Sequence, residues 1–72
     1  MIRVTVTVKG RLTQTANISP DGQSMEMLEG SRVRDLLVIL GLLDEEVKRV
    51  SVNGRRARPD ASLHPRDVIE LA

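Results

Sequence analysis

The chain begins with a strict alternation of apolar and polar residues, which predicts a strand over residues 2–9. β-Branched apolar side chains occupy every second position, and Arg, Thr and Lys residues lie between them. A period of two separates the two kinds of residue onto opposite faces of a strand, and β-branched residues favour strands. Shorter alternations predict further strands at residues 24–27, 48–52, 55–57 and 68–71. Thr15–Ile18 offers a weaker strand signal.

A second periodicity predicts one main helix over residues 33–40. Its apolar residues recur at i, i+3, i+4 and i+7, at Val33, Leu36, Leu37 and Leu40. These spacings place four side chains on one helical stripe. Ser31 is positioned to cap the first turn, and Gly41 to end the helix in the left-handed conformation. Because a helix this short is marginal alone in water, we expect it to pack across the sheet.

Turn signals separate the predicted strands. Asn53-Gly54 is typical of a type I′ hairpin, Ser19-Pro20-Asp21-Gly22 of a type I turn, and Asp44–Glu46 of a single helical turn. Leu63 is expected to plug the core beneath a loop. The order of elements predicts a single α+β domain over residues 1–72, with one main helix packed across a mixed sheet of four to five strands.

Composition narrows the chemistry. The 72 residues contain no Cys, Trp, Tyr or Phe and one His, and 11 Lys and Arg against 10 Asp and Glu give a formal net charge of +1. Without thiols, disulfides and cysteine-ligated metals are excluded. The absence of aromatics removes the stacking platform for single-stranded nucleic acid, and the near-neutral charge gives little attraction to nucleic acid or membranes. We expect no metal, no cofactor and a cytoplasmic location, since the first residues lack an apolar signal segment.

The sequence contains no catalytic constellation, so we expect no enzyme activity. His64 lies in a predicted turn and is interpreted as an exposed loop residue. Ser31 has no base at a recognisable spacing, so we interpret it as a cap and not a nucleophile. Arg55, Arg56 and Arg58 follow the Asn-Gly turn and could bind phosphate or an acidic partner. Charge on an edge strand also prevents edge-to-edge pairing, which is the simpler interpretation.

Three collinear segments carry recognisable motifs. Met25–Leu37 holds a strand end, an acidic-glycine turn and a helix start; Val50–Gly54 reads Val-Ser-Val-Asn-Gly; and residues 60–71 contain Asp-x-x-Leu followed by Asp-Val-Ile-Glu-Leu. In order and spacing they resemble the ubiquitin-like sulfur carriers (MoaD/ThiS-like proteins), which include the small subunit of molybdopterin synthase and the thiamine-biosynthesis carrier. The resemblance implies the ubiquitin-like β-grasp fold. TGS domains of tRNA synthetases and GTPases share some of these motifs.

The resemblance also implies a mechanism. In such carriers, an adenylyltransferase of the ubiquitin-activating type activates a C-terminal glycine carboxylate with ATP and magnesium. Sulfur then replaces AMP, and a partner such as a pterin or thiazole synthase consumes the thiocarboxylate. The printed sequence ends Glu70-Leu71-Ala72 without Gly-Gly. The C-terminal carboxylate therefore has this role only if a Gly-Gly tail follows Ala72. Arg66 also replaces the glycine that carriers usually have before the Asp, which predicts a changed turn.

The predicted alternation indicates a docking face on the sheet. If the apolar strand positions face the helix, the opposite face carries Arg3, Thr5, Thr7, Arg49, Ser51, Val68 and Glu70. In the carriers that face is substantially apolar and docks the activating enzyme, whereas here Val68 is its only apolar residue. This composition predicts weak binding or a polar partner. Three functions remain open: a sulfur carrier, a tail-less ubiquitin-like interaction module, and a TGS-like regulatory or RNA-contacting module.

Overall fold

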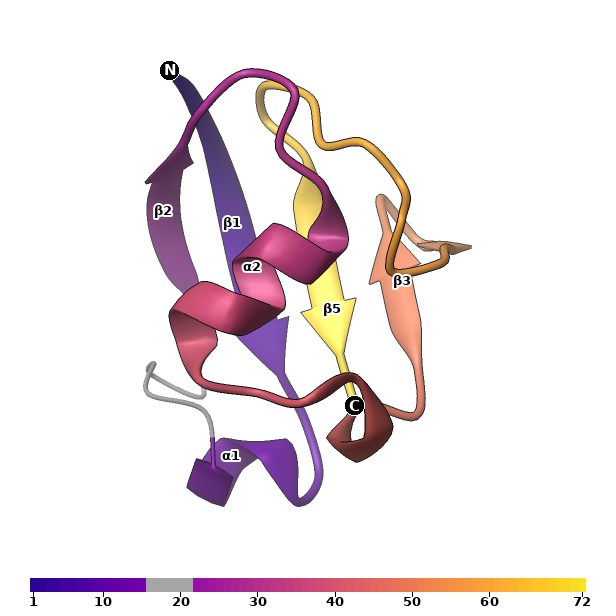
Figure 1. The fold of residues 1–72 in the computed structure, drawn as a ribbon. Helices are drawn as coiled ribbons and strands as arrows, with labels where there is room; N and C mark the ends of the chain where they lie inside the picture. The colour runs from indigo at the N-terminus through magenta and orange to yellow at the C-terminus, as the bar shows by residue number, and fades with distance from the viewer. Residues whose placement is uncertain (16–21) are drawn as a thin grey trace.

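A five-stranded mixed sheet with one main helix across one face forms the protein (Figure 1). The structure is a computed structural model that describes residues 1–15 and 22–72. The strands are β1 (Ile2–Val8), β2 (Gln23–Met27), β3 (Val50–Val52), β4 (Arg55–Arg56) and β5 (Val68–Leu71), in the spatial order β2-β1-β5-β3-β4. The central strands β1 and β5 are parallel, and the other pairs are antiparallel. This arrangement confirms the predicted α+β architecture.

The helix α2 (Val33–Leu40) packs on the sheet through the stripe that the sequence predicts. Val33, Leu36, Leu37 and Leu40 are all buried. They meet the alternate residues of the central strands, so that Val4, Val6 and Ile69 are at most 1% exposed. Gly41 ends the helix with φ 73°, and the Leu42 amide donates to the Leu37 carbonyl at 2.9 Å. Leu63 is buried beneath its loop, as predicted.

The start of α2 differs from the prediction that Ser31 caps it. Arg32 occupies the capping position, and its amide N–H donates to the Asp35 carboxylate at 2.8 Å. Ser31 belongs to the preceding loop, because its amide donates to the Leu28 carbonyl and its carbonyl accepts from Leu63. An acidic side chain one turn into the helix thus reaches back to the chain before it.

The segment after β1 contains a short helix that the sequence pattern does not predict. A one-turn helix α1 (Leu12–Thr15) follows Gly10, and Leu12 is buried in the core. Thr15 therefore ends a helix and starts no strand. The rest of the suggested Thr15–Ile18 strand and most of the suggested Ser19–Gly22 turn lie outside the described residues. The short helix η1 (Asp44–Glu46) confirms the other predicted helical turn.

Asn53 and Asp67 join the β3–β4 hairpin to the start of β5. Asn53 has φ 54° and Gly54 has φ 80°, as a type I′ turn requires. The Asn53 side chain donates to Asp67 Oδ1 and accepts from the Val68 amide, each at 2.9 Å. Asp67 is 7% exposed, and its Oδ2 accepts from the His64 amide at 2.8 Å. These contacts fix where β5 begins relative to β3.

Arg66, the residue before Asp67, has φ 69°. Arg66 takes the left-handed conformation that glycine adopts most readily, at the position where carriers usually have Gly. The expected change of turn relative to the carriers stays a prediction. The Arg66 amide donates to the Arg3 carbonyl at 2.8 Å, which holds the turn against β1.

In the described part of the chain, no helix is long and apolar enough to cross a membrane.

Candidate functional site

The face of the sheet opposite α2 brings together most of the residues expected to bind a partner. The register places Thr5 beside Val68, and it aligns Thr7, Glu70, Ser51 and Arg56 in one row across four strands. Cross-strand neighbours point to the same side of a sheet, so these side chains share one surface. Arg49 lies two residues before Ser51 and therefore joins the same face. We call this surface the sheet face.

Val68 is the apolar centre of the sheet face. Its side chain is 43% exposed, whereas the neighbouring β5 residues Ile69 and Leu71 are fully buried. Thr5 pairs with Val68 in register, and Ser51 lies in the next row of side chains, paired with Glu70. A partner can therefore approach the sheet backbone closely here and desolvate only one apolar group.

Charge on the sheet face is unevenly distributed. Glu26 pairs with Arg3 at 2.8 Å, and Glu70 pairs with Lys9 at 3.4 Å. Within the described residues, Arg49 and Arg56 have no carboxylate partner. They line a shallow hollow with Ser51 and Gly54. The β3–β4 end of this face therefore carries net positive charge.

The three arginines that follow the Asn-Gly turn do not lie on one surface. Arg56 pairs in register with Ser51, while Arg55 pairs with Val52. Since Val52 faces the helix side of the sheet next to buried Ile69, Arg55 and Arg56 lie on opposite faces. Arg58 lies beyond the end of β4 and is exposed. Only Arg56 joins Arg49 on the sheet face, a grouping that strand parity and pairing would have indicated.

The remaining titratable candidates do not form a site. The His64 side chain is 74% exposed, and its Nδ1 lies 3.9 Å from Asp67 Oδ2. It is a loop residue, as predicted. In the described ranges, no three acidic or histidine side chains come close enough to hold a metal ion.

Ala72 continues the pairing of β5 at the edge of the sheet face. Its carbonyl accepts from the amides of Lys48 and Arg49, each at 2.8 Å, and its own amide donates to the Arg49 carbonyl at 2.9 Å. Lys9 and Arg49 both line the surface hollow that includes Ala72. Any chain that continues past Ala72 starts beside these two cationic side chains.

Comparison with known proteins finds solved structures that share this fold. No family model and no curated protein sequence matches the chain. A Pyrococcus furiosus protein assigned as molybdopterin converting factor, subunit 1, superposes with a TM-score of 0.77 and 28% identity, covering 99% of this chain and 95% of that one. Two structures of small archaeal modifier protein 1 from Haloferax volcanii superpose with TM-scores of 0.73 and 0.75 at 17% and 15% identity, and cover 97% and 99% of this chain and 92% and 95% of theirs.

These likenesses confirm two expectations. The chain has the ubiquitin-like β-grasp fold, which all three structures share with it. It is a MoaD/ThiS-like small protein, because the match to the Pyrococcus protein extends over nearly the whole of both chains. The sequence motifs that carried the resemblance now have positions: Asn53 and Asp67 hold the fold together, and the sheet face lies beside them.

Proposed function

We propose that this protein is a docking module of the sulfur-carrier type, which binds a protein partner through the sheet face around Val68. The partner is an adenylyltransferase of the ubiquitin-activating type or a pterin or thiazole synthase subunit. The carrying observation is that the sheet face and Ala72 adjoin, since Arg49 pairs with Ala72 and also belongs to that face. A partner that covers Thr5, Val68 and Ser51 therefore also reaches the residue from which a tail would continue.

In this proposal the protein itself supplies no acid, base or metal. It supplies a surface that places its C-terminal segment, and the partner supplies the catalysis. If a Gly-Gly tail follows Ala72, the carboxylate of that tail is the group that the partner activates. Without such a tail, the same surface serves a ubiquitin-like interaction module. The intact mass of the protein purified from its native source distinguishes these two hypotheses, because it shows whether residues follow Ala72.

The composition of the sheet face defines the partner's chemistry. One exposed valine gives little apolar area, so the complex is held by polar contacts and is readily released. Arg49 and Arg56 lack carboxylate partners among the described residues, and we expect the partner to present acidic groups to them. Ready release suits a carrier that visits more than one enzyme.

Titration of the protein with the adenylyltransferase encoded in the same genome tests the proposal. Thr5→Glu and Ser51→Glu each place a carboxylate on the sheet face, and each is expected to weaken binding about tenfold or more. Thr5→Glu buries an unpaired charge in the interface, and Ser51→Glu puts a competing carboxylate beside the arginines that the partner would contact. Gln14→Glu is the matched control, since it adds the same charge on the exposed surface of α1. Wild-type affinity in both sheet-face variants would exclude this surface as the docking site.

The hypothesis of a TGS-like, RNA-contacting module is tested with the same purified protein. Arg49 and Arg56 would then contact phosphate groups, and titration with tRNA at moderate salt should show binding that Arg56→Gln weakens. No binding of tRNA removes this reading and leaves the protein partner.

A further inference from the structure

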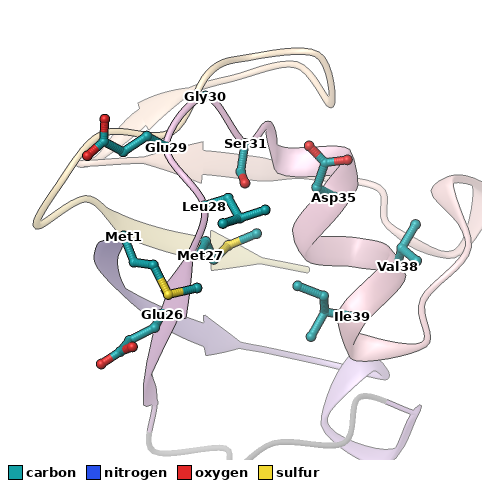
Figure 2. Close-up of a pocket in the computed structure, with 10 residues that line it drawn as sticks. All are labelled: Met1, Glu26, Met27, Leu28, Glu29, Gly30, Ser31, Asp35, Val38 and Ile39. Carbon is teal, nitrogen blue, oxygen red and sulfur yellow. The ribbon is translucent and has the colours of Figure 1, made fainter.

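A second surface, away from the sheet face, gathers most of the exposed apolar side chains. Among the described residues six large apolar side chains are exposed, and four of them line one groove between β2 and α2 (Figure 2). They are Met1, Leu28, Val38 and Ile39, with exposed fractions of 72%, 68%, 76% and 57%. Exposed apolar residues that occur singly are ordinary, but a contiguous group marks an interaction site. We call this surface the β2–α2 groove.

Among residues 1–15 and 22–72, no strand pairs with the outer edge of β2, which lies beside the groove. β2 pairs with β1 and stands at the end of the strand order. An edge strand presents backbone N–H and C=O groups that can pair with a further extended chain. Met25, on the helix side of β2, is only partly buried. A strand added to β2 would cover Met25 and place its own helix-side residues beside Val38 and Ile39.

Carboxylates predominate among the charged groups around the groove. Its lining includes the carboxylates of Glu26, Glu29 and Asp35 and no Lys, Arg or His side chain, as Figure 2 shows, and the α-amino group of Met1 is its one cationic group among the described residues. Glu26 is paired with Arg3, and Asp35 accepts from the Arg32 amide. Glu29 makes no side-chain hydrogen bond or ion pair within the described part of the chain. The rim therefore favours a cationic occupant.

We propose that the β2–α2 groove binds an extended protein segment with apolar side chains at alternate positions and Lys or Arg between them. The segment adds to β2 as a sixth strand. Its apolar side chains lie on the helix side against Leu28, Val38 and Ile39, because alternate residues of a strand share a face. Its cationic side chains point to the opposite side, where Glu26 lies, and its end meets Glu29 or Asp35. The five residues of β2 set the length of the paired segment.

A capped alternating Lys-Val peptide, about as long as β2, is the probe. Amide chemical shifts of the labelled protein should change at Met27, Leu28 and Ile39, and the binding should weaken as salt is added. The double variant Val38→Ser, Ile39→Ser removes two exposed contacts without touching the core, and is expected to weaken peptide binding about tenfold. Val68→Ser is the matched control, because it makes the same kind of change on the sheet face.

Three further peptides separate the parts of the proposal. Replacing Lys with Glu tests the charge of the rim, replacing Val with Ser tests the apolar contacts, and methylating alternate backbone nitrogens tests strand pairing. Each should lose most of the binding. Equal binding of the Glu peptide, equal binding of the methylated peptide, or shift changes confined to the sheet face would overturn the proposal. Concentration-dependent self-association through the same residues would also overturn it, because the occupant would then be a second copy of this chain.

This experiment is independent of the proposed docking of an adenylyltransferase. Val38→Ser with Ile39→Ser should leave binding to that enzyme unchanged, while Thr5→Glu should leave peptide binding unchanged. Loss of both interactions in one variant would show that the variant misfolds, and thermal melts of each variant check this directly.

Discussion

A single amide and a single carboxylate explain the most specific motif in the sequence. Asn53 is held by Asp67 and by the Val68 amide, and Asp67 is among the least exposed polar residues described. The Asn of the Val-Asn-Gly motif and the Asp before the last strand are therefore partners in one network. Their roles are structural: Asn53, which is itself exposed, satisfies the buried Asp67 carboxylate, and the pair aligns β5 with β3.

Asn53 is best tested with a pair of substitutions. Asn53→Gly keeps the positive φ of the turn but removes both side-chain hydrogen bonds, and should lower the free energy of unfolding by about 1–3 kcal/mol. Asn53→Ala should cost about 1 kcal/mol more, since alanine resists the left-handed conformation. Urea unfolding measures both. Equal stability of wild type and Asn53→Gly would mean that water replaces the network at no cost.

At Arg66, unlike at Asn53, substitution by glycine is expected to favour stability. A non-glycine residue at φ 69° is strained, and its side chain is exposed. Arg66→Gly should therefore be more stable than Arg66→Ala by about 0.5–1 kcal/mol, even though glycine increases the entropy of the unfolded chain. Thermal melts of the two variants measure the difference. The reverse order would show that the backbone is not strained at this position.

At the scale of an element, α2 depends on its buried stripe. Leu37 is 1% exposed and its neighbour Val38 is 76% exposed, so the two positions form a matched pair. Leu37→Asp would bury an unpaired carboxylate at a cost of several kcal/mol, enough to unfold a domain of marginal stability. Val38→Asp should leave the fold intact. Circular dichroism melts distinguish them, and a folded Leu37→Asp variant would contradict the packing of α2 on the sheet.

Elements with several periods were predictable, and single turns were not. β1 offers seven alternating positions and α2 a full i to i+7 stripe, so the pattern alone determines their type and buried face. α1 has four residues with one apolar side chain, which is too short for any period to be read. Its helical turn depends on Leu12 reaching the core, a tertiary contact that a local pattern does not contain.

The start of α2 illustrates a related limit. Ser31 and Asp35 both suit helix starts by residue type, and the sequence does not say which of the two provides the hydrogen bond. The choice depends on the loop path, because Ser31 is held by Leu28 and Leu63. Arg66 is similar, since its φ is set by contact with β1 and not by its own preference.

At the scale of the whole molecule, the two binding surfaces are chemically distinct. The sheet face is polar and carries two arginines that have no carboxylate partner in the described part of the chain, while the β2–α2 groove is apolar with a mainly acidic rim. The sheet face could be predicted from alternation, because parity alone assigns Thr5, Ser51 and Val68 to one side. The groove could not, since Met1, Leu28 and Val38 come together only when β2 and α2 are packed.

The division of the arginines yields a test of how the sheet face attracts its partner. Arg55 and Arg56 are adjacent in sequence but lie on opposite faces. Substituting either with Gln removes one positive charge, so the two variants differ only in the face that loses it. If the partner presents acidic groups to the sheet face, Arg56→Gln and Arg49→Gln should slow association several-fold at low salt and reduce its dependence on salt. Arg55→Gln should leave both unchanged. Stopped-flow measurements with the adenylyltransferase at several salt concentrations provide the comparison. Equal effects of Arg55→Gln and Arg56→Gln would mean that only overall charge steers the encounter, and that the sheet face has no particular role in it.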